Sequence, residues 1–245
     1  NASNDSVLRS SPELISALKA AYQAQESKLE DSSTQNVYQQ VNDSLMSATD
    51  PDASITRKNS EPSRPRYHHH RAVDDAQGVI TAVETTPGSI AENKKLLSLI
   101  DQHQANTQAK VETVVADRKY GTAENYIACQ EREIRTHIAP FLTHRKNEAI
   151  GIIPESEFKY QPEKDTYLCP AGKELIPRRL NVKRRTMEYY VPGRACLKCE
   201  LREKCTHSKT GRTLPRHEHQ KVLDKAKEQA QSSRGRRDRK RRQVL

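Results

Sequence analysis

Val114-Val115-Ala116-Asp117, followed by Arg118-Lys119-Tyr120-Gly121, is the stretch of sequence that decides the fold. The apolar run predicts a short buried strand, and the residues after it predict a turn that leads into a helix. The strand therefore ends by presenting the carboxylate of Asp117. A carboxylate at a strand end can hold a catalytic metal ion, but a lone Asp in this place can equally be a helix N-cap or a turn residue.

Two strands and a helix are predicted on the N-terminal side of this stretch. Residues 67–73 and 79–83 have strand-like composition, and the loop between them contains two Asp and a Gly. The helix is expected to begin near Ser89, which has capping-box spacing to Glu92. Its buried face would consist of apolar residues at helical spacing: Leu96, Leu97 and Ile100.

On the C-terminal side the elements alternate. Residues 111–116 form the strand that leads to Asp117, residues 122–130 are predicted to be a helix, and residues 135–142 a last strand. A helix that connects two strands favours a parallel pair, whereas the hairpin at 67–83 adds antiparallel strands. The order of elements therefore predicts an α/β fold with a mixed sheet and flanking helices.

Composition divides the chain into four segments. Residues 1–66 are a polar helical segment and a linker, and residues 67–145 hold the strands and helices of the core. Residues 146–215, named the insertion, are basic and Cys-rich without clear periodicity. Residues 216–245 form a basic helical tail.

The charge of the chain predicts a polyanionic partner. The 245 residues carry a net charge of +10, and only 33% of them are hydrophobic. Lys and Arg gather in residues 159–209 and fill most positions of residues 234–242, which is typical of nucleic-acid binding, although a charged tail can also be merely solvated. No apolar run approaches the roughly 20 residues that span a bilayer, and no signal peptide is visible, so we expect no membrane partner.

Four of the five cysteines lie in the basic insertion. Cys196 and Cys199 form a C-x-x-C pair, whose short loop lets both thiolates reach one ion. Cys169 and Cys205 would complete a tetrahedral zinc site, which would hold together a segment too polar to build its own core. The alternatives are four reduced structural cysteines or a site that has lost its metal. If Cys205 is not a ligand, a nearby His would replace it: His207, His217 or His219.

Two other features are interpreted as structural. In a strand, His68 and His70 would share one face and His69 the other, and we expect all three to lie on a solvated or edge strand. Cys129 falls within the helix predicted at 122–130, where it is expected to be a small buried apolar residue.

Six blocks of residues, in order, cover roughly residues 48–219 and carry a family resemblance. The chain resembles bacterial insertion-sequence DDE transposases, of the branch with a Cys-containing insertion. The blocks are Thr49-Asp50-Pro51-Asp52-Ala53, then Val73-Asp74 with Gly78-Val79-Ile80, then Val114 to Gly121, then Tyr167-x-Cys169-Pro170-Ala171-Gly172, then Cys196-x-x-Cys199-x-Leu201-Arg202-x-x-Cys205, and finally Arg216-His217-Glu218.

The resemblance implies an RNase H-like fold and two-metal phosphoryl transfer, in which carboxylates hold two Mg²⁺ (or Mn²⁺) ions during DNA strand cleavage and strand transfer. Asp117 matches the second of the family's three acids. The implied partners are the DNA ends of the element and its target DNA, with a homodimer in the synaptic complex. The implied location is the bacterial cytoplasm, at the nucleoid.

The resemblance also leads us to expect that the chain is cut at both ends, shortly inside its catalytic triad, and is inactive as it stands. The first acid would precede Asn1, and the last would follow the basic residues 234–245. Lys119 stands where relatives commonly have Gly, which suggests a divergent element. The alternatives are a non-catalytic, zinc-stabilised nucleic-acid-binding module and a decayed remnant of a mobile element.

Overall fold

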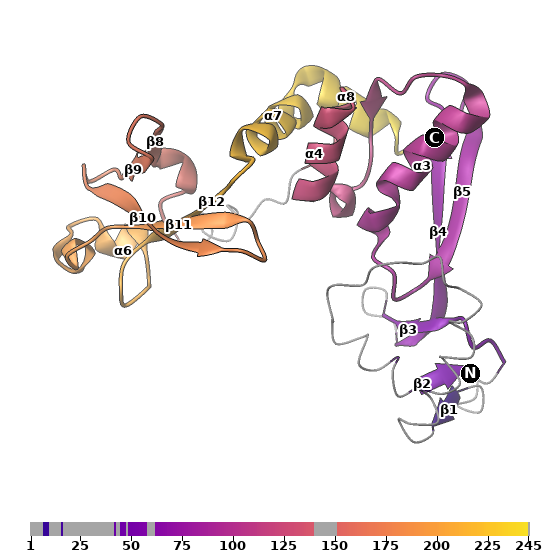
Figure 1. The fold of residues 1–245 in the computed structure, drawn as a ribbon, viewed down its shortest axis with the longest axis horizontal. Helices are drawn as coiled ribbons and strands as arrows, with labels where there is room; N and C mark the ends of the chain where they lie inside the picture. Colours follow the sequence, from indigo (N-terminus) through magenta and orange to yellow (C-terminus); the bar gives the residue numbers. More distant parts are fainter. Residues whose placement is uncertain are drawn as a thin grey trace. The chain divides into compact units, whose positions relative to one another are not determined.

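A computed structural model describes residues 7–9, 16, 42, 45–47, 49–57, 62–139 and 151–244 (Figure 1). The chain forms two compact units, one made of residues 1–113 with 240–245 and the other of residues 114–239. Helices and several sheets are present, so the predicted α/β class is confirmed. Within the ranges given above, no helix is both long and apolar enough to cross a membrane. Most of the polar helix expected in residues 1–50 lies outside the described residues.

The first unit consists of two small antiparallel sheets and one helix. One sheet has the order β3-β4-β5, with α3 packed on β5 and β4, and the other pairs β1 with β2 (Figure 1). The elements are β1 (Val7–Arg9), β2 (Leu45–Ser47), β3 (Ser54–Thr56), β4 (Arg64–Val73), β5 (Ile80–Pro87), the 3-10 helix η2 (Glu92–Lys95) and α3 (Leu96–Thr107).

The β4–β5 hairpin is closed by the local chemistry of its loop. The carboxylate of Asp74 accepts a hydrogen bond from the backbone N–H of Gln77 at 2.8 Å, and Gly78 adopts a φ of +67° that favours glycine. Both predicted strands are found. They are longer than expected at their far ends, where β3 pairs with β4 inside the segment predicted as a linker.

The helix of this unit begins later than predicted. Ser89 does not cap it, because its hydroxyl lies 2.9 Å from the hydroxyl of Ser54 on β3, and the N-cap position of α3 is Lys95. Leu96 and Ile100 are buried as predicted, together with Leu99 instead of Leu97.

His70 shows that β4 is less solvated than expected. Its side chain is only 3% exposed, and its Nε2 lies 2.9 Å from the hydroxyl of Thr86 on β5. Burial, and after it the charge of His68, lowers the pKa of His70. The expectation of a solvated strand is therefore wrong at His70, which packs toward the interior, whereas the edge alternative holds among the described strands because residues 67–73 of β4 pair with β5 only.

The second unit begins with a strand–helix–strand arrangement that the C-terminal helices cover. β6 and β7 form a two-stranded sheet, and α7 packs against α4 and β7. Cys129 and Ile138 are completely buried in this part. The elements are β6 (Thr113–Val114, whose first residue belongs to the first unit), the 3-10 helix η3 (Arg118–Tyr120), α4 (Ala123–Glu131), β7 (Arg135–Thr136), α7 (Gln220–Gln231) and α8 (Ser233–Arg241).

Between β7 and α7 the chain forms a five-stranded antiparallel sheet of order β12-β11-β10-β9-β8. Its core is small and consists of Phe158, Leu175, Tyr189 and Leu214. This sheet was not predicted, and the insertion does build a core of its own. The strands are β8 (Lys159–Gln161), β9 (Thr166–Leu168), β10 (Glu174–Asn181), β11 (Thr186–Tyr190) and β12 (Thr213–His217).

Two tyrosines of this sheet contact one carboxylate, and the ring of a third packs against theirs. The phenol groups of Tyr160 and Tyr189 both donate to Asp165 Oδ1, at 2.8 and 2.5 Å. The guanidinium of Arg216 lies 3.6 Å from the ring centroid of Tyr160 and donates to the phenol oxygen of Tyr167 at 3.2 Å. These contacts link β8, β9, β11 and β12 without a large apolar core.

The single mixed sheet expected for the core is not found among the described strands, which are distributed over four sheets. β4 is a physical reason for this difference. Its one buried side chain is that of His70, so it lacks the apolar residues on both faces that a central strand of a buried sheet needs. β6 and β7 are also shorter than predicted.

Candidate functional site

Asp117 lies at the N-terminal cap of η3, three residues after the end of β6. Its backbone is extended, with φ −66° and ψ 156°, and its carbonyl accepts a hydrogen bond from Tyr120 N–H at 3.0 Å. The side chain makes no capping hydrogen bond and is exposed. Asp117 therefore occupies the N-cap position with its backbone, but its side chain does not cap the helix. The carboxylate faces solvent, where a ligand can reach it.

The turn after Asp117 is held close to the end of β7. A Cβ on Gly121 would lie 2.5 Å from the phenol oxygen of Tyr126 and 3.1 Å from the carbonyl oxygen of Arg118, so only glycine fits. The Tyr126 phenol donates to the carbonyl of Ile138, and His137 N–H donates to the carbonyl of Val114 at 2.9 Å. Residues before and after Asp117 are therefore fixed against β7 and the residues that follow it.

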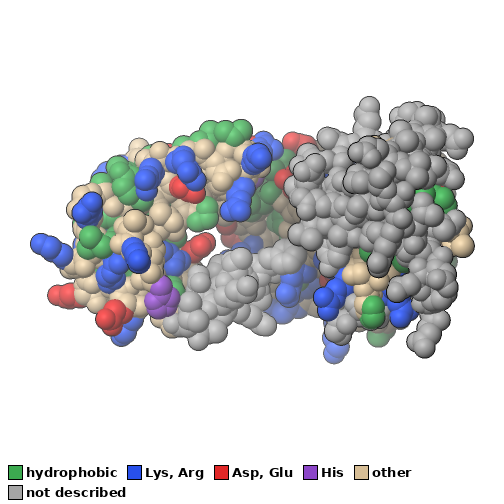
Figure 2. Space-filling model, turned by 90° about the horizontal axis from the view of Figure 1, so that it is seen from below, with side chains coloured by type: hydrophobic (Ala, Val, Ile, Leu, Met, Phe, Trp, Pro, Cys, Tyr) green, Lys and Arg blue, Asp and Glu red, His purple; other side chains and the backbone are tan. Residues whose placement is uncertain are grey.

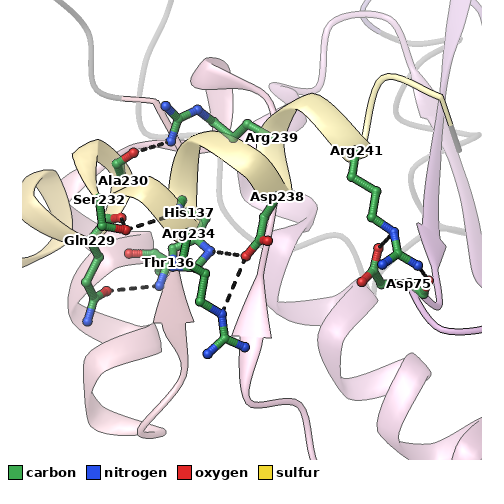
Figure 3. Close-up of polar contacts among 11 residues, drawn as sticks. Asp75, Thr136, His137, Gln229, Ala230, Ser232, Arg234, Asp238, Arg239 and Arg241 are labelled. Atoms are coloured by element: carbon green, nitrogen blue, oxygen red, sulfur yellow. Dashed lines mark hydrogen bonds and ion pairs between the residues drawn. The ribbon is translucent and has the colours of Figure 1, made fainter.

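The C-terminal helices α7 and α8 are attached to the same strand end by side chains (Figure 3). The side-chain oxygen of Gln229 on α7 accepts the N–H of Thr136 at 3.1 Å. His137 is only 3% exposed, and its Nδ1 donates to the carboxylate of Asp238 on α8 at 2.7 Å. Arg234 Nε lies 3.9 Å from the same carboxylate.

A glycine sets the junction between the two helices. Gly235 is buried, and a Cβ there would lie 2.3 Å from the carbonyl oxygen of Gln229. Sequence reasoning missed this junction and the His137–Asp238 pair. The two residues of the pair are 101 positions apart, so no local spacing relates them.

The four insertion cysteines lie around one cavity. Cys169, Cys196, Cys199 and Cys205 all line it, together with apolar residues such as Phe158 and Leu175. None of the alternative His ligands is among its lining residues.

The turns that carry these cysteines are tightly formed. The N–H of Lys173 donates to Cys169 Sγ at 3.2 Å, and the N–H of Gly172 donates to the Cys169 carbonyl at 2.9 Å. Gly211, at a φ of +113°, approaches so closely that a Cβ there would lie 3.1 Å from Cys196 Sγ. The Nζ of Lys173 donates to the carbonyl of Ala195 at 2.6 Å, which links two of the turns.

The structure gives no metal centre at either candidate site. Among the described residues, no group of three or more His, Cys, Asp or Glu side chains is arranged so that it could hold a metal ion. Asp117 supplies a single carboxylate, which is too few oxygen ligands for a Mg²⁺ pair. The four thiols share a cavity without forming a coordination group, so zinc binding is not supported by this geometry.

Burial changes the acidity of two of the cysteine thiols. All five are free. Burial is the main cause that raises the pKa of Cys205, and the neighbouring thiols act in the same direction. Burial raises the pKa of Cys129 to about 11, as expected for a structural apolar residue.

Comparison with known proteins identifies one relationship. A family model described as "Transposase DDE domain" matches residues 31–237, which is most of the chain. No curated protein and no solved structure matches it.

Proposed function

The chain belongs to the transposase DDE domain family, and from this premise we propose that residues 67–145 are part of an RNase H-like catalytic core for DNA strand cleavage and transfer. Enzymes of this family act on DNA with a divalent metal ion. The observation that carries the proposal is the exposed carboxylate of Asp117, which makes no capping hydrogen bond and lies three residues after β6. A carboxylate so placed can reach a metal ion at the phosphate of a bound DNA strand.

Asp117 is proposed as a metal ligand and not as a general acid or base. Mg²⁺ or Mn²⁺, when bound, neutralises charge on the reacting phosphate. One carboxylate does not form that site, and among the described residues no group of three or more His, Cys, Asp or Glu side chains could hold a metal ion. The proposal for this chain alone is therefore DNA binding without strand cleavage.

The test compares two variants of the protein that includes the sequence flanking these residues in its gene. With Mg²⁺ or Mn²⁺ it should nick duplexes carrying the ends of its element, and Asp117→Asn should abolish nicking. Asp224→Asn is the matched control, because Asp224 is exposed on α7 and its Oδ1 accepts from Gln220, which an Asn oxygen can still do. Nicking retained by Asp117→Asn would reject the role of Asp117.

A second candidate function is a non-catalytic nucleic-acid-binding module built on the insertion. The observation that favours it is that β8 to β12 have their own core, apart from the strand that leads to Asp117. DNA binding without any nicking by the longer protein would favour this candidate, or a decayed remnant of an element.

Zinc in the insertion remains a subsidiary proposal. It rests on the spacing of the four cysteines and on the cavity that they line, and in this structure the four thiols form no coordination group. Metal analysis of purified protein decides it. Absence of zinc, with free alkylation of all four thiols, would reject the site and leave four reduced cysteines.

The remaining proposals depend on the family alone. They are that the partners are the ends of the element and target DNA, that two copies act together in a synaptic complex, and that the protein works in the bacterial cytoplasm at the nucleoid. Gel filtration with and without DNA of the element's end would test the dimer.

A further inference from the structure

We propose that the β10–β11 hairpin is a DNA-contacting arm whose basic tip enters a groove of duplex DNA. The inference rests on the proposed DNA function and adds to it a contact surface that is separate from Asp117. The hairpin comprises β10, β11 and the turn of residues 182–185 between them. Neither the cysteine cavity nor the His137–Asp238 pair is part of it.

The tip of this hairpin concentrates positive charge. Five of the eight residues from Arg178 to Arg185 are Lys or Arg, and all five side chains are exposed. Glu188, the one acid on the hairpin beyond its base, lies 3.5 Å from Arg179. Figure 2 shows Lys and Arg side chains spread over the visible face of the part that contains β8 to β12.

Two of these charges are available for a partner. Within the described residues, Lys183 and Arg184 form no ion pair, whereas Arg185 pairs with Glu218 next to β12. Long cationic side chains at a turn stay hydrated, so they contribute little to the free energy of folding. They are therefore free to bind phosphate.

The backbone of the tip is defined by the fold. The N–H of Arg185 donates to the carbonyl of Val182 at 3.1 Å, and the N–H of Arg184 donates to the Asn181 side chain at 3.1 Å. β12 pairs with β11 along its length, from Thr186 opposite His217 onward. The turn therefore has a fixed shape on a three-stranded support, which limits the entropy lost on binding.

Two features of the tip are unfavourable for the stability of the folded protein. Arg185 adopts a φ of +50°, a conformation that favours Gly or Asn. Leu180 and Val182 are 55% and 77% exposed, although a soluble turn usually carries polar residues. Exposed apolar side chains beside free cationic side chains are the kind of surface that contacts the phosphates, sugars and base edges of DNA.

Protection of a sheet edge is the competing explanation for part of this charge. β9 pairs with β10 only at Glu174 and Leu175, so the rest of β10 is an edge strand, and charged residues with Pro177 discourage edge pairing. That explanation covers Arg178 and Arg179 but not the turn. Residues of the turn offer no free strand edge, and edge protection would be served by charge of either sign.

Duplex DNA is the partner that fits best, because a two-stranded ribbon enters its major groove and its phosphates match the arginines. The test measures binding of the full chain to a fluorescent duplex by anisotropy at several salt concentrations, without added divalent metal. Lys183→Gln with Arg184→Gln removes the two free charges of the tip. Lys221→Gln with Lys225→Gln on α7 is the matched control, since it removes two exposed charges elsewhere.

Loss of two phosphate contacts should weaken binding by about tenfold and reduce the slope of log K against log salt by about 1.8, at roughly 0.9 for each contact. The α7 control should keep the wild-type slope. Stronger binding to single strands than to the duplex would reject groove entry.

A hairpin variant that binds duplex like wild type, or an α7 control that loses as much, would overturn the proposal while leaving the DNA function intact. Absence of DNA binding by the wild-type chain would instead reject the DNA function itself. This binding is measured without divalent metal and nicking is measured with it, so failure at the catalytic carboxylate and failure at the hairpin give different results.

Discussion

Removal of the Asp238 carboxylate should loosen α8 from the end of β7. In the folded protein the His137 ring is almost completely buried, and the carboxylate 2.7 Å away is the acceptor for its Nδ1–H. Asp238→Ala leaves that donor without its partner inside the unit. The variant creates no backbone conflict, because alanine is a good helix residue.

The size of the effect follows from the burial of the two groups. An unsatisfied buried donor costs about 1–3 kcal/mol, and hydrogen bonds to charged groups lie in the upper part of that range. The Asp238 side chain is 26% exposed, so water can replace part of the lost bond. We expect the free energy of unfolding to fall by about 1–2 kcal/mol, which lowers Tm by roughly 3–8 °C for a unit of this size.

Urea unfolding followed by circular dichroism measures this loss as a shift of the midpoint at constant m-value. Asp238→Asn should lose less than half as much, because the amide oxygen can still accept from His137. Asp224→Ala on α7, whose side chain is exposed, is the control and should stay within about 0.5 kcal/mol of wild type. A loss for Asp238→Ala no larger than this control would refute the reasoning, since α8 would then be held by other contacts.

Three further predictions concern the two units separately. His70 has a pKa below its ordinary value of 6.5. It therefore stabilises the fold fully above pH 6.5, and this stability is lost as the pH falls through the lowered pKa. The dependence of Tm on pH should be shallower for His70→Gln than for wild type, and an equal slope would contradict this. Cys129 should resist iodoacetamide at pH 8 in native protein, because it is buried with a pKa of about 11, and react in urea; mass spectrometry of the labelled peptide checks this, with rapid native labelling as the contrary result. Leu175→Ala should destabilise the five-stranded sheet by about 2–5 kcal/mol, and exposed Leu180→Ala by far less; equal urea midpoints for the two variants would contradict the assigned core.

Helices and hairpins with strong local signals could be predicted from the sequence. The helix predicted at 122–130 is present as α4. Its start is fixed locally, because the Thr122 hydroxyl accepts the N–H of Asn125. The β4–β5 hairpin is found for the same reason, through Asp74 and Gly78.

The five-stranded sheet could not be predicted because little apolar patterning marks it. β10 buries only Leu175 fully, and its Pro177 and two arginines read as a charged loop. Its strands are joined instead by tyrosine hydroxyls, a carboxylate and a guanidinium, which have no periodic signal in the sequence.

The candidate site was predicted in part. The position of Asp117 after a strand was expected, and the structure places it there with an exposed side chain. The pair of His137 and Asp238 at the end of β7 was missed, because burial creates their pairing and neither residue lies in a recognisable motif. The spacing of the four cysteines in the sequence predicted that their thiols lie near one another, and they line one cavity. Sequence spacing does not determine the exact positions of the sulfur atoms, so it could not predict whether they form a coordination group.

The tyrosine cluster around Asp165 makes the insertion optically distinct. The chain has no Trp, so its ultraviolet emission comes from tyrosine alone. Two phenols donate to one carboxylate, and an excited phenol is a much stronger acid that can pass its proton to such an acceptor without emitting light. Tyrosine fluorescence should therefore brighten as β8 to β12 come apart, and unfolding of this sheet can be followed in the unlabelled protein.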